Sequence, residues 1–239
     1  MTVNAKALLD RARRIIQDET NVRWPLPELR LWMNDSLREI GLIKPTAYST
    51  SAIITLSQGT LQRLPDAYTS VMRVVRNLKS NTDSPRQGGA AIRTVDREML
   101  DAQVPNWHDS ANTKYQKTVK HAVFEASDPR AFYVYPGNDG AGIVEAIVSK
   151  IPSSVPAPVS NADDINSYDV TIDIHDIYSN VILDYMLYRA YSKDSQYAGS
   201  AQRAALYYAA FSNALGAKLA NESALNPNVK PTTQQENAA

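Results

Sequence analysis

The stretch Asp176-Ile-Tyr-Ser-Asn-Val-Ile-Leu-Asp-Tyr-Met-Leu-Tyr-Arg-Ala-Tyr191 carries apolar residues at steps of three and four, interrupted only by the charge of Asp184. This spacing predicts a helix with a broad buried face. Ser192–Gly199 breaks the pattern, and Ser200–Ala220 resumes it with many alanines, the strongest helix formers. We therefore predict a hairpin of two long helices that pack through Tyr185, Tyr188, Ala204, Ala205, Tyr208 and Phe211.

Two further helices are predicted near the N-terminus. Ala5–Asp18 has an apolar stripe at helical spacing, and Pro27 with Glu28 begins a second helix that runs to about Ile40. We expect Gly41 to end that helix in a left-handed conformation and Pro45 to prevent its continuation. These helices and the hairpin predict a helical bundle formed by both ends of the chain.

The middle of the chain consists of short runs rich in β-branched residues, separated by turn residues. Their short spacing predicts an antiparallel β domain of the sandwich or barrel type. Asp96 is expected to cap a short helix within it. Ser80–Ala90 contains Asn, Asp, Pro and Gly, and predicts an exposed loop that trypsin cuts at Arg86. The predicted strands are Ser51–Leu56, Val71–Arg76, Ile92–Val95, Val119–Glu125, Ala131–Tyr135 and Gly142–Ile151.

The predicted fold class is α+β, with terminal helices packed as a bundle, an inserted antiparallel β domain and an extended C-terminal tail. The last segment has mostly small and polar residues and cannot form a core. We place the boundaries at 1–45 for the N-terminal helices, 46–155 for the β domain, 156–222 for a linker and the hairpin, and 223–239 for a flexible tail.

Composition restricts the classes of function. With 25 basic and 25 acidic residues the net charge is zero, which argues against a general nucleic-acid coat or a membrane-surface binder. The absence of cysteine excludes disulfides and thiolate metal sites. The N-terminus does not read as a signal peptide, and no stretch approaches about 20 apolar residues. We expect a soluble protein, made in the cytoplasm and without contact with a membrane.

No catalytic, cofactor or metal site is predicted. The sequence has no Gly-x-Ser-x-Gly motif and no glycine-rich phosphate loop. The three histidines His108, His121 and His175 lie far apart in the sequence. Asp173-Ile-His-Asp176 offers metal ligands, but we interpret it as a surface pair with Asp176 as a helix N-cap. The arginines of 11–14 could touch phosphate, although a basic face on such a helix is usually solvated.

A series of motifs runs through most of the chain, from about residue 5 to about residue 220. It comprises Trp32-Met-Asn-Asp-Ser-Leu-Arg-Glu-Ile40, Gln62-Arg-Leu-Pro65, Arg73-Val-Val-Arg-Asn77, Pro105-Asn-Trp107, Asp128-Pro-Arg-Ala-Phe-Tyr-Val-Tyr-Pro136 and Asp184-Tyr-Met-Leu-Tyr-Arg-Ala-Tyr191. In this order and spacing, the motifs resemble tailed-bacteriophage head–tail adaptor (connector) proteins, similar to tail tubular protein A-like adaptors.

The resemblance implies a structural virion protein at the head–tail junction, with a role in tail assembly and genome ejection. Proteins of this kind form a ring, generally a dodecamer, between the portal protein and a tail or nozzle protein. DNA passes through the ring without sequence-specific binding. No catalytic residues are implied. Because such adaptors often thread a terminal segment between portal subunits, the resemblance implies portal-binding residues in the tail: Leu225, Asn226, Pro227, Val229 and Lys230.

Two alternatives from other classes stay open at this point. One is a tail-associated enzyme, such as a cell-wall hydrolase that uses His108 or His175. The other is a monomeric tail or fibre binding module built on the β domain. Molar mass in solution, with and without portal protein, distinguishes both from a ring-forming adaptor.

Overall fold

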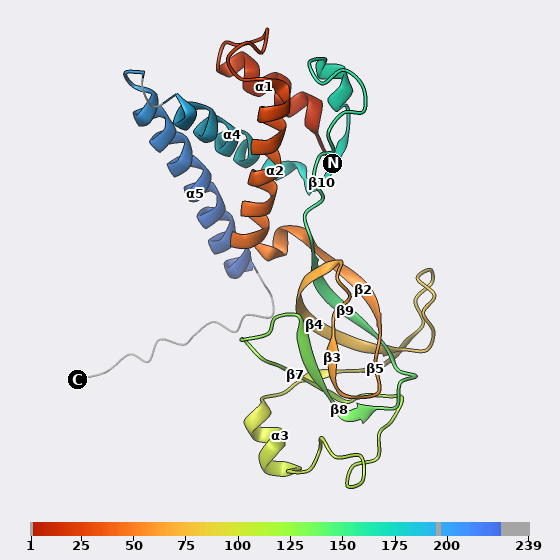
Figure 1. The fold of residues 1–239 in the computed structure, drawn as a ribbon. Helices are drawn as coiled ribbons and strands as arrows, with labels where there is room; N and C mark the ends of the chain where they lie inside the picture. Colours follow the sequence, from red (N-terminus) through yellow and green to blue (C-terminus); the bar gives the residue numbers. More distant parts are fainter. Residues whose placement is uncertain (1, 195–196, 226–239) are drawn as a thin grey trace, which may run out of the picture. The chain divides into compact units, whose positions relative to one another are not determined.

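The chain divides into two compact units, one of helices and one of β-strands. A computed structural model describes residues 2–194 and 197–225, with side chains up to residue 216 (Figure 1). The helical unit is formed by the two ends of the chain, up to Lys44 and from Ser153 onward, and the β unit spans Pro45–Pro152. The described residues contain five α-helices and sheets whose strand pairs are antiparallel with one exception. The predicted α+β class is therefore confirmed.

The helical unit is built around one central helix. Val181 and Ala190 lie on opposite sides of this helix, and both are buried, because its sequence is apolar nearly all round. It packs against three other helices of the unit. Trp24 lies in the loop that connects the two N-terminal helices. It anchors this loop to the central helix, because its Nε1 donates to the carbonyl of Ala190 over 3.2 Å. The elements are β1 (Thr2–Asn4), α1 (Ala5–Ile15), α2 (Leu26–Ile43), β10 (Thr171–His175), the central α4 (Ser179–Lys193) and α5 (Ser200–Leu225).

The two N-terminal helices follow the predicted apolar stripes but end elsewhere. α1 stops at Ile15, three residues before the predicted end, because Gln17 takes a left-handed φ of 58°. α2 continues through Gly41 to Ile43, so the predicted glycine cap is wrong. Leu42 and Ile43, past Gly41, are exposed, so the end of α2 lies outside the buried apolar stripe. The helix ends at Ile43, two residues before Pro45, which lacks the N–H that a further turn would need.

Asn34 ties the linker after the β unit to α2. Its side-chain amide donates to the carbonyl of Val155 over 3.0 Å and accepts from the amide of the same residue over 2.7 Å. Arg30 donates to that carbonyl as well, over 2.9 Å. Asn34 and Val155 are buried, so this pairing satisfies backbone groups that have no strand partner.

The β unit consists of two four-stranded sheets that share one core. Their strand orders are β2-β9-β4-β5 and β3-β8-β7-β6. Alternate side chains of both sheets point into the core, with Val74, Phe132 and Val144 among those fully buried. The strands are β2 (Ser49–Thr55), β3 (Gly59–Arg63), β4 (Tyr68–Leu78), β5 (Gly88–Ala91), β6 (Arg93–Thr94), β7 (His121–Phe124), β8 (Ala131–Asn138) and β9 (Ile143–Lys150).

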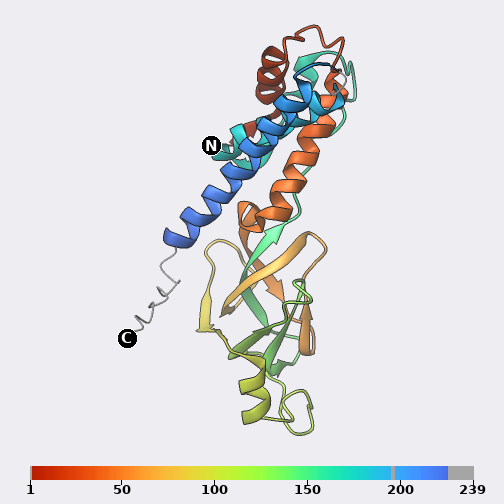
Figure 2. The ribbon, with the colours of Figure 1, turned by 90° about the vertical axis from the view of Figure 1, so that its left-hand side faces the viewer.

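A smaller core covers the other face of the second sheet. Leu100 of α3 (Arg97–Gln103) and Trp107 of the loop after it are buried against Val123 of β7, in a cluster separate from the main core. Figure 2 shows α3 as the short yellow-green helix. The indole of Trp107 donates to Asp101 over 2.7 Å. Asp96 caps α3 through a hydrogen bond from the Glu98 amide, so this predicted cap is confirmed.

Three strand predictions need correction. β3 lies where the sequence predicts a plain connection, and β5 lies at the end of the predicted loop Ser80–Ala90. Both are short edge strands. β3 buries the polar Thr60 and Gln62 and exposes Leu61, and β5 has no buried side chain, so neither sequence shows an apolar alternation. β6 pairs with β7 in parallel, because α3 and the following loop form a connection long enough to bring the chain back in the same direction.

Candidate assembly surfaces

The two long C-terminal helices meet through aromatic rings. Tyr185 of α4 lies edge-on to Phe211 of α5, with 5.1 Å between ring centroids, and Tyr188 lies 5.0 Å from Tyr208. Phe211 is fully buried, and Ala204 is 7% exposed on the same side of α5. The structure therefore brings together five of the side chains selected from the sequence: Tyr185, Tyr188, Ala204, Tyr208 and Phe211.

Ala205 is exposed, which contradicts its predicted place in the hairpin contact. It lies one residue beyond Ala204, and a step of about 100° along the helix turns it away from α4. It shares the outer surface of α5 with Leu206, which is 70% exposed, and with Ala209, which is exposed as well. Between residues 200 and 216 the only charged residue is Arg203. An outward helix surface with so little charge is typical of a contact surface rather than a solvated one.

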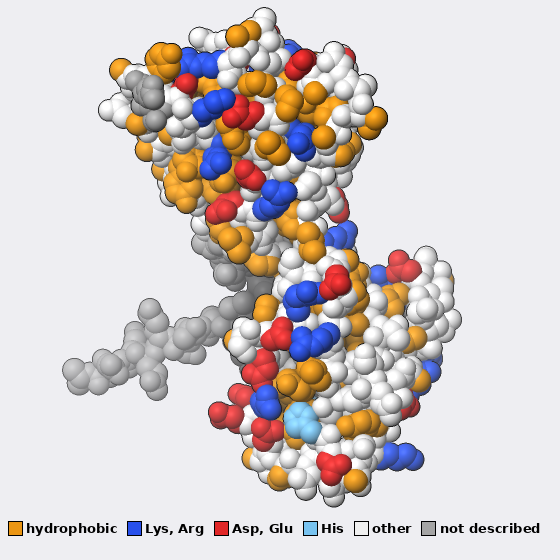
Figure 3. All heavy atoms as spheres, in the orientation of Figure 1, with side chains coloured by type: hydrophobic (Ala, Val, Ile, Leu, Met, Phe, Trp, Pro, Cys, Tyr) orange, Lys and Arg blue, Asp and Glu red, His pale blue; other side chains and the backbone are white. Residues whose placement is uncertain are grey.

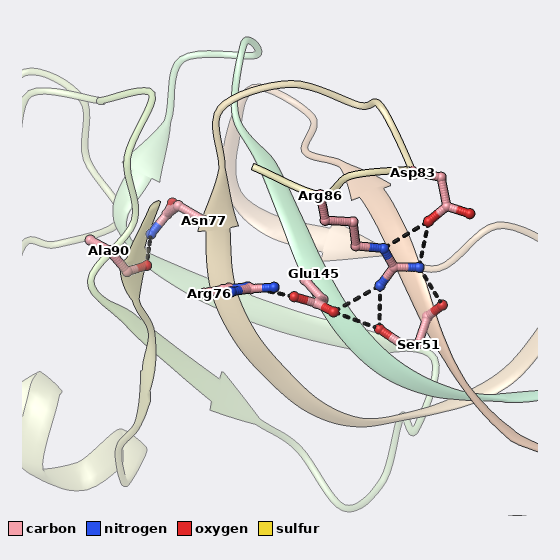
Figure 4. A network of polar contacts seen from close by, with 7 residues as sticks. All are labelled: Ser51, Arg76, Asn77, Asp83, Arg86, Ala90 and Glu145. Carbon is pink, nitrogen blue, oxygen red and sulfur yellow. Dashed lines mark hydrogen bonds and ion pairs between the residues drawn. The ribbon is translucent and has the colours of Figure 1, made fainter. Parts of the chain in front are cut away.

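A polar network lies on the outer face of the sheet β2-β9-β4-β5 (Figure 4). Glu145 of β9 accepts from Arg76 of β4 over 2.6 Å, from Arg86 over 2.8 Å and from the hydroxyl of Ser51 over 2.9 Å. The Arg86 guanidinium also pairs with Asp83 over 2.7 Å. No local sequence pattern predicts this network, since Arg86 and Glu145 are 59 residues apart.

Burial alone would raise the pKa of the Glu145 carboxyl. The hydrogen bonds from Ser51, Arg76 and Arg86 together outweigh burial and lower that pKa below its ordinary value. The same contacts with Asp83 and Glu145 raise the pKa of Arg86. Both shifts favour the charged forms of Glu145 and Arg86, and these contacts hold Arg86 in place rather than free in a mobile loop.

Residues 3–231 match the SU10 adaptor protein family. The match covers nearly the whole sequence of 239 residues. The chain belongs to the SU10 adaptor protein family. No curated protein matches it.

Membership of the SU10 adaptor family confirms the resemblance to phage adaptors. It implies a structural component of the virion that takes part in tail assembly and interacts with portal and tail components. It also implies a role other than catalysis. Within the described part of the chain, no helix combines the length and the apolar character needed to cross a membrane.

The portal-binding residues predicted for this SU10 adaptor lie outside the part whose side chains are described. Leu225 is the last residue of α5, and only its backbone is described. Asn226, Pro227, Val229 and Lys230 lie beyond the described residues.

The histidines have separate structural surroundings. His108 and Thr60 share a hydrogen bond of 2.8 Å, and His121 stacks on Tyr135. Burial lowers the pKa of both imidazoles, and nearby cations add to the effect, so the neutral form of each ring is favoured. His175, rather than the predicted Asp176, accepts from the amide of Ile177 before α4. Among the described residues, no three His, Cys, Asp or Glu side chains form a group that could hold a metal ion.

The arginines of α1 are engaged within the helical unit. Arg11 donates to Asn180 over 3.0 Å, while Arg13 and Arg14 pair with Asp10. On the face of this unit shown in Figure 3, basic and acidic side chains alternate with hydrophobic ones. Neither observation provides a continuous basic tract of the kind that binds a nucleic-acid backbone.

Proposed function

We propose that this SU10 adaptor forms a homo-oligomeric ring, a dodecamer as in the adaptors it resembles, that joins the portal vertex to the tail. The observation that carries the proposal is the family match over residues 3–231. The ring surrounds the channel through which DNA leaves the head. A net charge of zero supports this role, since a channel must let DNA slide without holding it.

The outer surface of α5 supports self-association. A ring needs a heterologous contact, in which one patch of a subunit meets a different patch of its neighbour. Ala205, Leu206 and Ala209 offer an apolar patch without acidic groups on a rigid helix. Covering such a patch removes apolar area from water at a gain of about 25 cal/mol per Å². We assign this patch to the contact between neighbouring subunits of the ring.

The C-terminal tail is the proposed contact with the portal protein. Leu225 and Val229 are its branched aliphatic residues, and Pro227 restricts the backbone between them. A preset backbone loses less entropy when it docks, and many tails docking around one ring gain avidity. Asn226 and Lys230 complete the proposed segment with polar groups for the portal subunits. Further surfaces of the ring meet a tail or nozzle protein.

The test is molar mass by size-exclusion chromatography with light scattering, alone and with portal protein. We expect a ring or a portal complex for the wild type. Leu206→Glu places a charge in the proposed subunit contact and should reduce the ringed fraction at least tenfold, equivalent to about 1.4 kcal/mol. Val22→Glu is the matched control, because Val22 is 82% exposed and lies outside α5.

The two rival functions predict different results. A chain that stays monomeric, ignores portal protein and hydrolyses cell-wall substrate would be a tail-associated enzyme. A monomer with neither activity nor portal contact would be a tail or fibre binding module. Either outcome overturns the ring proposal. If Leu206→Glu leaves the ring intact, the ring proposal stands, but the assignment of the subunit contact to α5 is refuted.

A further inference from the structure

β2 is the edge strand of its sheet. It pairs with β9 on one side, and no strand pairs with it on the other side within the described residues. In the antiparallel pair, Leu56 donates to the carbonyl of Gly142, so Leu56 is a hydrogen-bonded position. The pairing keeps one register from Ser49 to Thr55. Because antiparallel ladders alternate, the backbone groups of Ser51, Ile53 and Thr55 point away from β9.

This edge lacks most of the usual protections against strand pairing. The sequence of β2, Ser-Thr-Ser-Ala-Ile-Ile-Thr, contains no charge and no proline, and it has no bulge against β9. Exposed edges of this kind readily add another strand. Among the described residues, Ile53 and Thr55 have no partner for their outward backbone groups.

Within the part of the chain that the structure describes, the outward carbonyl of Ser51, unlike those of Ile53 and Thr55, has a partner in Arg86. Its Nη2 donates to the backbone carbonyl of Ser51 over 3.2 Å, and its Nη1 donates to the Ser51 hydroxyl. Arg86 belongs to the segment Lys79–Gln87 between β4 and β5, which we name the strap. From the strap, its side chain crosses the outer face of the sheet to reach Ser51 (Figure 4). Arg86 therefore covers an edge acceptor that a pairing strand would need.

The strap is held on the sheet by Arg86 and little else. The side chains of residues 81–85 and of Gln87 are exposed, and none of them adds a buried apolar contact. Its base is fixed by the pairing of Leu78 with Gly88 and by a hydrogen bond from Lys79 to Gln87. The far end depends on the contacts of Arg86 with Glu145 and Ser51.

We propose that Arg86 guards the free edge of β2 and prevents it from pairing with β2 of a second copy. The outward positions are self-complementary about Ile53. An antiparallel partner related by a twofold axis places Ser51 opposite Thr55 and Ile53 opposite its own counterpart. Such a twofold contact closes after two copies. It therefore competes with ring growth, and the guard keeps subunits available for the ring.

The test measures hydrogen exchange of the Ser51, Ile53 and Thr55 amides at rising protein concentration. In the wild type these amides should exchange rapidly at every concentration. In Arg86→Ala they should become protected as concentration rises, by about tenfold or more, together with a concentration-dependent rise in molar mass. This readout concerns β2 alone, so it is independent of whether the helical unit forms a ring.

Two further variants make the result specific. Asp83→Asn is the control, because it keeps the contacts of Arg86 with Glu145 and Ser51 and should leave the edge amides unprotected. Arg86→Ala combined with Ile53→Lys should lose the protection, since like charges would meet across the twofold axis. The proposal is overturned if the edge amides stay unprotected in Arg86→Ala, or if they are already protected in the wild type. Protection that arises only after a tail protein is added would assign the edge to that partner instead, and would overturn it too.

Discussion

Tyr185 on α4 and Phe211 on α5 form an edge-to-face pair with ring centroids 5.1 Å apart. The pair marks the contact that unites the two long C-terminal helices. Because Phe211 is fully buried, Phe211→Ala should lower the free energy of unfolding by about 3–5 kcal/mol. Tyr208→Ala is the control and should cost far less, since Tyr208 is 45% exposed. Denaturant unfolding followed by circular dichroism measures both. Equal losses would contradict the assigned packing.

Ala204 and Ala205 provide a matched pair of substitutions. Leu at position 204 overpacks the contact with α4 and should cost about 1–3 kcal/mol of stability. Leu at position 205 projects into solvent in the single chain and should leave the thermal midpoint of the monomer within about 1–2 °C of the wild type. Its effect should appear in ring formation, if the outer surface of α5 is the subunit contact. A lower thermal midpoint for Ala205→Leu with no change for Ala204→Leu would show that Ala205, and not Ala204, faces α4.

The depressed pKa of Glu145 predicts an acid-sensitive contribution to stability. In the unfolded chain a glutamate titrates at about 4.3, and in the folded chain Glu145 titrates lower. Its contribution is therefore present above the unfolded pKa and is lost as the pH falls through the folded one. The wild type should melt higher than Glu145→Gln at pH 7, and the gap should close in acid. A gap that widens below about pH 4 would contradict this.

How far the sequence predicts the structure depends on periodicity. The apolar stripe of α2 and the cap at Asp96 are local features, and both are confirmed. β3 buries polar side chains and β5 buries none, so neither leaves an apolar signal. The prediction that Ala205 packs against α4 was wrong for a different reason. A helix as rich in alanine as α5 does not show from composition which alanine faces its partner.

The contact between Arg86 and Glu145 could not be predicted for a topological reason. The strap follows β4, and Glu145 belongs to β9, so the two meet only because β9 pairs with β4 and with β2. The loop composition correctly indicates exposure for residues 81–85, but it does not show that one arginine returns to the sheet. The expected cut by trypsin at Arg86 therefore has to be revised. Cleavage should be slow in the wild type and fast in Glu145→Gln.

Replacing the three histidines by alanine should leave assembly intact. His108 loses one hydrogen bond with Thr60, which costs about 1 kcal/mol, and His121 loses its stacking on Tyr135. Neither change touches α5 or the tail. Molar mass and thermal melting of each single variant provide the measurement. A variant that folds normally but abolishes adaptor function would revive the enzyme alternative.

Truncation tests the proposed portal contact of the tail. A chain that ends at Ser223 lacks Leu225 and Val229, the two proposed apolar anchors, together with the polar groups between them. It should keep its circular dichroism spectrum and thermal midpoint, because of the described elements only the last two residues of α5 are removed. Capture by portal-bearing heads should fall by more than the loss from a single site, since every subunit of the ring loses its anchor at once.

The control for this experiment is a chain that ends at Pro231, which keeps Leu225–Lys230 and removes only the residues after them. It should attach to heads like the full chain. The double substitution of Leu225 and Val229 by Ser then separates the apolar anchors from tail length, and should reproduce the defect of the shorter chain. Normal attachment of the chain ending at Ser223 would refute the portal contact. A defect in both truncated chains would move the contact to residues beyond 231.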